Sequence, residues 1–228
     1  MLNVDMKKKV TNYSTRDHVY QVLRENIISL ELEPGQTISE KEISELLQVS
    51  RTPVREAFVK LVQEELLEVY PQRGTFISLI DLQHVEEARF IREHLERAAV
   101  REACKSFSAE NLLKLEQNLA MQKLCVKEKD FNRLFELDEE FHYTITVGCG
   151  KERIWTVIQQ MNAHLNRIRM LSLVANYNWD LILSQHEEII SAIKEKNPDK
   201  ADKVMEDHLK KLTFEQESLK SEYRKYFK

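Results

Sequence analysis

The chain has 228 residues, 42% of them hydrophobic, which is enough for two domains with cores of their own. Its 32% of charged residues, beside only four glycines and four prolines, predict a mostly helical protein. The absence of long apolar runs excludes a transmembrane span and a secretory signal, so we expect a cytoplasmic protein. Three widely spaced cysteines without a CxxC pair exclude a disulfide framework and a zinc ribbon, and a net charge of −4 requires any nucleic-acid interface to be local.

Two helices are expected before residue 48. The first runs from Thr15 and ends before Pro34-Gly35, with an apolar stripe that includes Leu23 and Ile27. The second starts at a capping box, Ser39-Glu40-Lys41-Glu42, in which Ser39 bonds forward and Glu42 reaches back. Apolar residues follow this box at helical spacing, so a short amphipathic helix is predicted there.

The next segment, QVSRTPVREAFVK, predicts a turn and a third helix that begins at about Ser50. Ser50 and Thr52 can accept hydrogen bonds from the free amides of a first helical turn, and proline is tolerated there. The basic end of this helix combines Arg51, Thr52 and Arg55, whose side chains suit base edges and phosphates. Together the second and third helices predict a helix-turn-helix that places its basic end in a major groove. The residues expected to face the core are Val54, Phe58, Leu61 and Val62.

Two strand-like runs follow this helix, residues 66–70 and 75–78, around the turn Pro71-Gln72-Arg73-Gly74. A basic hairpin after a recognition helix is a wing. Arg73 at its tip is expected to enter a minor groove or to contact phosphate, and Gly74 lets the backbone come close.

The first 80 residues hold ten lysines and arginines against twelve acidic residues, so this part is not basic overall. A basic surface for DNA must therefore be formed by a subset of residues on one face. The candidates are Lys7 to Lys9, Arg16, Lys41, Arg51, Arg55, Lys60 and Arg73.

A domain boundary is expected at residues 79–81, where Asp81 can cap a new helix. The proposed domains are residues 1–79, a winged helix-turn-helix, and residues 80–228, an all-helical antiparallel bundle. The fold class is thus mainly α with a small β-hairpin wing. The expected helices of the bundle cover residues 82–106, 108–127, 130–147, 151–175, 179–195 and 198–225.

Four side chains of the bundle have the pattern of a metal site. Asp138 and His142 are four residues apart, which puts them on one face of a helix, while His186 and His208 lie on two later helices near their apolar faces. Three imidazoles and a carboxylate suit zinc, nickel, manganese or iron. From spacing alone, a surface Asp–His pair and hydrogen-bonded core histidines remain open alternatives.

Residues 30–77 closely resemble the winged helix-turn-helix of GntR-family transcriptional regulators, and residues 80–228 resemble the all-helical FCD domain of the FadR-like branch. The FCD resemblance is carried by Arg92 with Leu95-Glu96, the Asp138–His142 pair, the break at residues 148–150, and the segments around His186 and His208. Two departures are Glu65, where the family usually has Gly before the wing, and Lys151, where it often has Asn. By this resemblance the DNA-contacting positions include Lys41, Arg51, Thr52, Arg55 and Arg73-Gly74, and the metal ligands are Asp138, His142, His186 and His208, with zinc or nickel favoured.

An open metal site flanked by arginine favours a small carboxylate effector. The candidate partners are Arg92, Arg167 and Arg169, of which the last two point to different faces of a helix; we prefer Arg169 and add His164 as a further pocket residue. For each arginine, an ordinary salt bridge is the alternative.

The sequence therefore predicts a homodimeric, ligand-responsive repressor that binds double-stranded DNA at an inverted repeat. The expected DNA-binding residues are Lys41, Ser50, Arg51, Thr52, Arg55, Arg73 and Gly74. A metalloregulator that senses the metal itself is the first alternative. A metal-dependent enzyme fused to a DNA-binding domain is the second, and we expect no enzyme because GxSxG, P-loop and HExxH motifs are missing.

Overall fold

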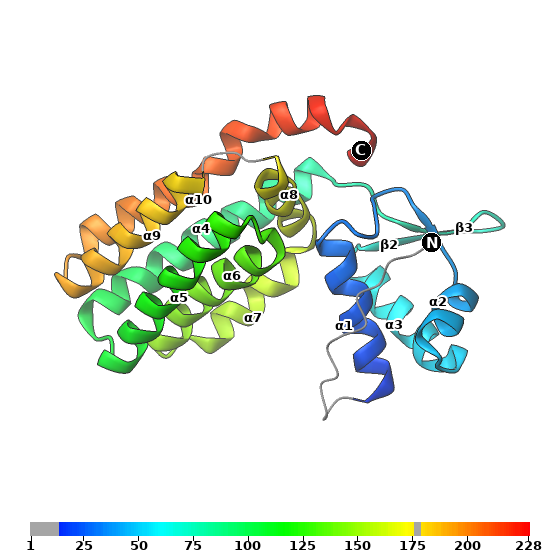
Figure 1. Cartoon of the computed structure of the whole chain (residues 1–228), viewed down its shortest axis with the longest axis horizontal. Helices are drawn as coiled ribbons and strands as arrows, with labels where there is room; N and C mark the ends of the chain where they lie inside the picture. Colours follow the sequence, from blue (N-terminus) through cyan, green and yellow to red (C-terminus); the bar gives the residue numbers. More distant parts are fainter. Residues whose placement is uncertain (1–13, 176–178) are drawn as a thin grey trace.

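The structure is a computed structural model that describes residues 14–175 and 179–228, without the side chains of residues 212–215. The predicted basic residues Lys7 to Lys9 lie outside this description. A small N-terminal part with helices and a sheet is followed by a larger helical bundle (Figure 1). The predicted fold class, mainly α with a small β wing, is confirmed.

The N-terminal part contains α1 (Thr15–Ile28), α2 (Glu40–Leu47) and α3 (Arg51–Gln63). The Ser39 hydroxyl caps α2: it accepts from the Glu42 backbone N–H at 3.2 Å and donates to the Glu42 carboxylate at 2.8 Å. Gln48 ends α2 with a φ of 53°, and this left-handed residue turns the chain toward α3. The helix-turn-helix geometry thus follows from a cap at one end and a single left-handed residue at the other.

Two expectations for α3 were wrong. Ser50 occupies the N-cap position, but its side chain makes no capping hydrogen bond. Pro53 lies in the first turn of α3, where its missing N–H leaves no donor unpaired. Val62 does not face the core and is 38% exposed, whereas Val54, Phe58 and Leu61 are buried as predicted. The four predicted core residues span a wider arc of the α3 surface than α1 covers, and Val62 lies at the edge of that arc.

The wing consists of β2 (Leu67–Tyr70) and β3 (Gly74–Ile77), paired antiparallel with Tyr70 opposite Gly74. A third strand, β1 (Thr37–Ile38), pairs with β3 and was not predicted because two residues carry no periodicity. The order in the sheet is β1-β3-β2. At the bend between α3 and β2, Glu65 adopts a φ of 59°, so the chain makes this turn with a residue other than the usual glycine.

The bundle was predicted closely except at one place. The expected helix over residues 151–175 is two helices, which meet at Asn162, a residue with φ −82° and ψ 1°. No Gly or Pro marks this break, and the helical spacing of apolar residues continues across it, so the sequence predicted one helix instead of two. The helices of the bundle are α4 (Leu82–Lys105), α5 (Ala109–Glu128), α6 (Phe131–Gly148), α7 (Glu152–Met161), α8 (Ala163–Val174), α9 (Trp179–Lys194) and α10 (Pro198–Glu222).

Helix α8 and the end of the chain connect the bundle with the N-terminal part. Leu23 and Ile27 of α1 share a buried cluster with Met170 and Leu173 of α8. After α10, a short 3-10 helix (Arg224–Tyr226) brings the chain back toward the sheet (Figure 1), where residues 80 and 227 form an isolated parallel bridge. None of the helices described is long and apolar enough to cross a membrane.

Candidate metal centre and nucleic-acid interface

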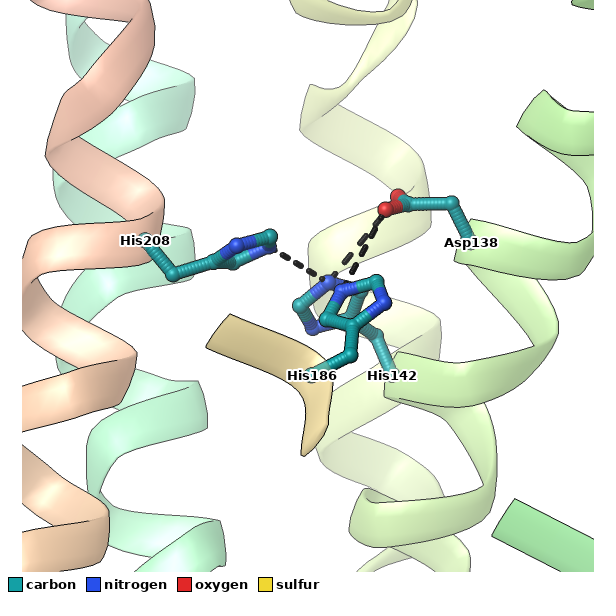
Figure 2. A group of neighbouring side chains, drawn as sticks. All are labelled: Asp138, His142, His186 and His208. Atoms are coloured by element: carbon teal, nitrogen blue, oxygen red, sulfur yellow. Dashed lines mark hydrogen bonds and ion pairs between the residues drawn. The ribbon is translucent and has the colours of Figure 1, made fainter. Parts of the chain in front are cut away.

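Four predicted ligands meet inside the bundle. Asp138 and His142 project from α6, His186 from α9 and His208 from α10, and one donor atom from each lies within 4.8 Å of the other three (Figure 2). An Asp138 carboxylate oxygen lies 3.5 Å from His186 Nε2 and the other lies 3.9 Å from His142 Nε2. The Nε2 atoms of His142 and His208 are 3.1 Å apart. Metal bonds of about 2.0–2.1 Å place neighbouring ligand atoms roughly 2.9–3.4 Å apart. The separation of the two histidine nitrogens lies in this range, whereas the two carboxylate–imidazole separations are wider, so the four donors would draw closer together around a common ion.

The second ring nitrogen of each histidine has an oxygen partner. Nδ1 of His142 contacts the Glu96 carboxylate, Nδ1 of His186 lies 2.9 Å from the Gln122 side-chain oxygen, and Nδ1 of His208 lies 3.1 Å from that of Gln185. An oxygen acceptor at Nδ1 requires a proton on Nδ1, and in a neutral ring the lone pair then lies on Nε2. In the neutral form of each ring, the Nε2 lone pair therefore points into the cluster.

This arrangement calls for a cation. Lone pairs of His142 and His208 that face each other at 3.1 Å repel unless a proton or a metal ion satisfies them. His186 Nε2 is buried and has no hydrogen-bond partner among the described residues. Three imidazoles and one carboxylate form a donor set that suits zinc and other late first-row divalent ions.

Electrostatics keep three of the ligands, Asp138, His186 and His208, in their metal-binding protonation states. Burial alone would raise the pKa of Asp138, but the neighbouring Arg169 guanidinium holds it well below its usual range. Burial lowers the pKa of His186 to about 3 and that of His208 well below its ordinary value. The carboxylate is therefore ionised, and these two imidazoles are neutral, at physiological pH.

The arginine next to the cluster is itself paired. Arg92 donates to Glu96 at 2.6 Å, and both side chains are almost completely buried. Burial would raise the pKa of Glu96, but Arg92 and His142 lower it to about 2. Arg92 Nη2 is also buried and has no partner among the described residues, so it offers a free donor.

A cavity of about 80 Å³ opens beside the four ligands. Arg92 and Arg169 line it, as predicted, and so do the ligands Asp138 and His208. Arg169 pairs with Asp138 and Glu139, which holds a cation at the edge of the cluster. The apolar part of the wall consists of Phe135, Leu165, Leu173, Ile182 and Leu209.

The prediction that His164 belongs to this pocket was wrong. Its ring lies on the opposite side of α8, where it meets His84 of α4 and Glu65 of the N-terminal part. One donor atom from each of the three residues lies within 4.8 Å of the other two. Arg167 is fully buried beside it and donates to the Ser78 carbonyl at 2.5 Å. Helical geometry explains the error: neither residue shares the face of α8 that carries Arg169.

The hydrogen bonds at His164 argue against a second metal site. Its Nδ1 accepts from the Asp81 backbone N–H at 3.0 Å and from Arg167 Nη2 at 2.9 Å. Both partners can only donate, so Nδ1 is unprotonated and Nε2 carries the proton of the neutral ring. Burial lowers the pKa of His164 to about 3, which keeps it neutral. The nitrogen that faces Glu65 therefore has no lone pair for a metal.

The predicted DNA-binding residues lie on α2, at the start of α3 and in the turn of the wing. Figure 1 shows α2 and the tip of the wing on the side of the N-terminal part that faces away from the bundle. At the start of α3, Arg51 and Thr52 are exposed, and Arg55 is exposed while paired with Glu40 at 3.2 Å. Gly74 follows the tip of the wing with a φ of 109°, a conformation that favours glycine. The other exposed candidates are Lys41, Ser50 and Arg73.

Several residues around the cluster were not predicted as functional. Gln122 and Gln185 accept hydrogen bonds from ligand histidines but belong to no recognisable motif. In the separate group at His164, Glu65 and His84 meet that residue only because the bundle packs against the N-terminal part. The sequence indicates Glu96 only through the FCD resemblance, which does not show its contact with His142. The adjacency of Gln185 to His186 was the one local signal, and it is a weak one.

Comparisons with known proteins agree with this architecture. Residues 15–77 match the bacterial regulatory proteins of the gntR family, and residues 87–211 match the FCD domain. The HTH-type transcriptional repressor RspR of Escherichia coli K12 is 32% identical over 209 residues, which cover 92% of each chain. The gluconate operon transcriptional repressor of Bacillus licheniformis is 29% identical and covers 85% of this chain and 81% of its own. The solved structure of Escherichia coli McbR/YncC has a TM-score of 0.79 at 20% identity, covering 93% of this chain and all of that one.

Proposed function

The chain belongs to the GntR family of bacterial regulatory proteins and is a DNA-binding transcriptional regulator of the FCD type, and from this premise we propose that it is a repressor controlled by a small carboxylate. In this proposal residues 1–79 bind an inverted-repeat operator as a homodimer in the cytoplasm, and residues 80–228 form the effector-binding and dimerisation domain. No catalytic residue is assigned.

The single observation that carries the sensing role is the convergence of Asp138, His142, His186 and His208 beside a cavity lined by arginine. We assign these four side chains as ligands of one divalent metal, with zinc or nickel favoured. An ion that takes five or six ligands would keep coordination positions open for an anionic ligand beside these four side chains. Arg92, with its free Nη2 donor, and Arg169 are the groups assigned to pair with the ligand's carboxylate.

Helix α8 is the element that we propose connects effector binding with DNA binding. Arg169 contacts Asp138 on the cavity side, while Arg167, two residues earlier, is bonded to Ser78 immediately after β3. A carboxylate that binds Arg169 competes with Asp138 for it and so favours a different position of α8. The resulting change in DNA affinity is limited by the difference in the effector's affinity for the two states.

The test starts from an operator selected from random-sequence DNA by the purified protein, with binding measured by fluorescence anisotropy. Metal-loaded protein is then titrated with a panel of small mono-, di- and tricarboxylates. The proposal expects at least one of them to release DNA from the loaded protein, and Arg169→Met to abolish this response while DNA binding persists. Release by zinc or nickel alone would replace the carboxylate sensor by a metalloregulator, and conversion of the acid into a product would indicate an enzyme.

The proposed DNA contact of Arg55 has a separate test. If Arg55 reads a base, Arg55→Ala lowers operator affinity by about 1–3 kcal/mol and removes discrimination at one base pair. Arg133→Ala is the matched control, because Arg133 is also an exposed arginine paired with a glutamate, but on α6. Equal operator affinity of the two variants would remove Arg55 from the interface.

A further inference from the structure

One imidazole of the cluster is held by a chain of buried amides. His186 is completely buried, its ring stacks on Phe141 with centroids 4.0 Å apart, and its Nδ1 lies 2.9 Å from the side-chain oxygen of Gln122. Gln122 is also completely buried. The stacking fixes the plane of the ring, and the amide fixes the direction of its hydrogen bond.

The orientation of both amides follows from the far end of this chain. Asn118 donates through Nδ2 to the backbone carbonyl of Leu137 at 3.0 Å, and Gln122 donates through Nε2 to the Asn118 side-chain oxygen at 2.7 Å. A carbonyl can only accept, so Asn118 must direct its NH₂ group at Leu137 and its oxygen at Gln122. Gln122 must in turn direct its NH₂ at Asn118 and its oxygen at His186. The last acceptor then requires a proton on His186 Nδ1.

The secondary structure explains why these groups line up. Asn118 and Gln122 are four residues apart on α5 and therefore share one face. That face packs on α6, where Leu137 immediately precedes the ligand Asp138. We call Asn118 and Gln122 the amide relay. The relay starts at α6, the helix that supplies the Asp138 carboxylate, and ends at His186 of α9.

We propose that Asn118 and Gln122 are positioning residues that select the tautomer of His186 and so direct its Nε2 lone pair at the metal. The proposal rests on the metal site of the proposed function, but its first step, the tautomer, is a property of the metal-free protein. Neither residue touches the cavity or the other ligands in the interactions described, so the relay acts through His186 alone.

The tautomer is measured directly in metal-free protein labelled with ¹⁵N-histidine, by long-range ¹H–¹⁵N correlation with His186 assigned through His186→Ala. The relay predicts a proton on Nδ1 in the wild type and in Gln122→Glu, which keeps an acceptor. In Gln122→Met, which has similar shape and no acceptor, the Nε2–H form becomes substantially populated. A wild-type ring protonated on Nε2, or an unchanged tautomer in Gln122→Met, would overturn the proposal.

Zinc affinity, measured by competition with a chromophoric chelator at fixed pH, supplies the second readout. Gln122→Met is expected to weaken binding by roughly 10- to 100-fold and Gln122→Glu to restore it. Asn118→Leu, one step further from the metal, is expected to weaken binding less, by roughly 3- to 10-fold. Thermal unfolding of each metal-free variant separates loss of positioning from loss of fold.

The two readouts separate the relay from the site itself. A wild type that binds no zinc but carries the proton on Nδ1 would remove the metal site and leave the relay as the determinant of this tautomer. A wild type that binds zinc with the same affinity as Gln122→Met would leave the site and contradict the relay.

Discussion

Within the part of the chain that the structure describes, two groups of histidines and carboxylates bring donor atoms within 4.8 Å of one another, one inside the bundle and one between the bundle and the N-terminal part. They differ at the ring nitrogen that faces away from the group. In the bundle, Nδ1 of His142, His186 and His208 faces oxygen acceptors, whereas Nδ1 of His164 faces two donors. In the bundle, an acceptor at Nδ1 directs the Nε2 lone pair of a neutral ring toward the group. At His164, the two donors occupy the Nδ1 lone pair and leave a proton on Nε2, so proximity alone does not identify a metal site.

The cations next to the two groups differ in the same way. Arg92 is paired with a buried carboxylate, whereas Arg167 contacts a carbonyl, a hydroxyl and an imidazole and has no carboxylate within 4 Å among the described residues. Burial lowers the pKa of Arg167 to about 9. In the bundle, the buried cation Arg92 is paired with the buried carboxylate of Glu96. Arg167 is buried against neutral groups instead, which costs free energy of folding.

Replacing each arginine by methionine gives the largest difference between the two regions. Arg92→Met leaves the Glu96 carboxylate buried without its cation, and we expect the free energy of unfolding to fall by about 3–5 kcal/mol. Arg167→Met leaves no carboxylate uncompensated and removes a costly buried charge, so a change within about 2 kcal/mol is expected. Urea denaturation of the metal-free proteins measures both. Equal losses would mean that charge balance does not distinguish the two regions.

Removing one histidine from each group tests the assignment of metal ligands. His142→Ala deletes one of four ligands, and because structural zinc sites bind with roughly 10–16 kcal/mol in total, zinc affinity should fall by at least about 100-fold. His84→Ala removes a histidine of the other group and should leave zinc affinity unchanged. Competition titration against a chelator provides the numbers, and a comparable loss in His84→Ala would show that the group at Glu65 also binds the ion.

The pH dependence of stability tests the protonation of His164. Its folded pKa is about 3 and the unfolded value is about 6.5, so between these values the unfolded chain binds more protons. The stability contribution is complete above pH 6.5 and is lost as the pH falls toward 3, by up to about 1.4 kcal/mol per pH unit. His164→Asn keeps an acceptor for the Asp81 N–H and lacks the titrating ring, so its loss of stability on acidification should be smaller. Parallel curves for the two proteins would contradict a buried neutral His164.

Much of the fold could be predicted because its signals are local. The cap at Ser39, the basic start of α3 and the turn around Gly74 each act within a few residues, and the spacing of Asp138 and His142 places both on one helix face. These signals identified the helix-turn-helix, the wing and the first pair of proposed ligands.

The parts that could not be predicted depend on tertiary structure. The break at Asn162 carries no Gly or Pro, and the side of α8 on which His164 lies depends on how the bundle packs against α1. Gln122 becomes important only because α5 places it against a histidine that lies 64 residues later in the chain. No periodicity or motif encodes such a contact.

Elemental mass spectrometry of purified, untagged protein, after supplementation with divalent metal, shows whether the bundle group binds one metal ion and the group at Glu65 binds none. We expect about one ion per chain in the wild type and in His164→Asn, and almost none in His142→Ala and His186→Ala. Two ions per chain with one lost in His164→Asn, or no ion in any preparation, would contradict this expectation.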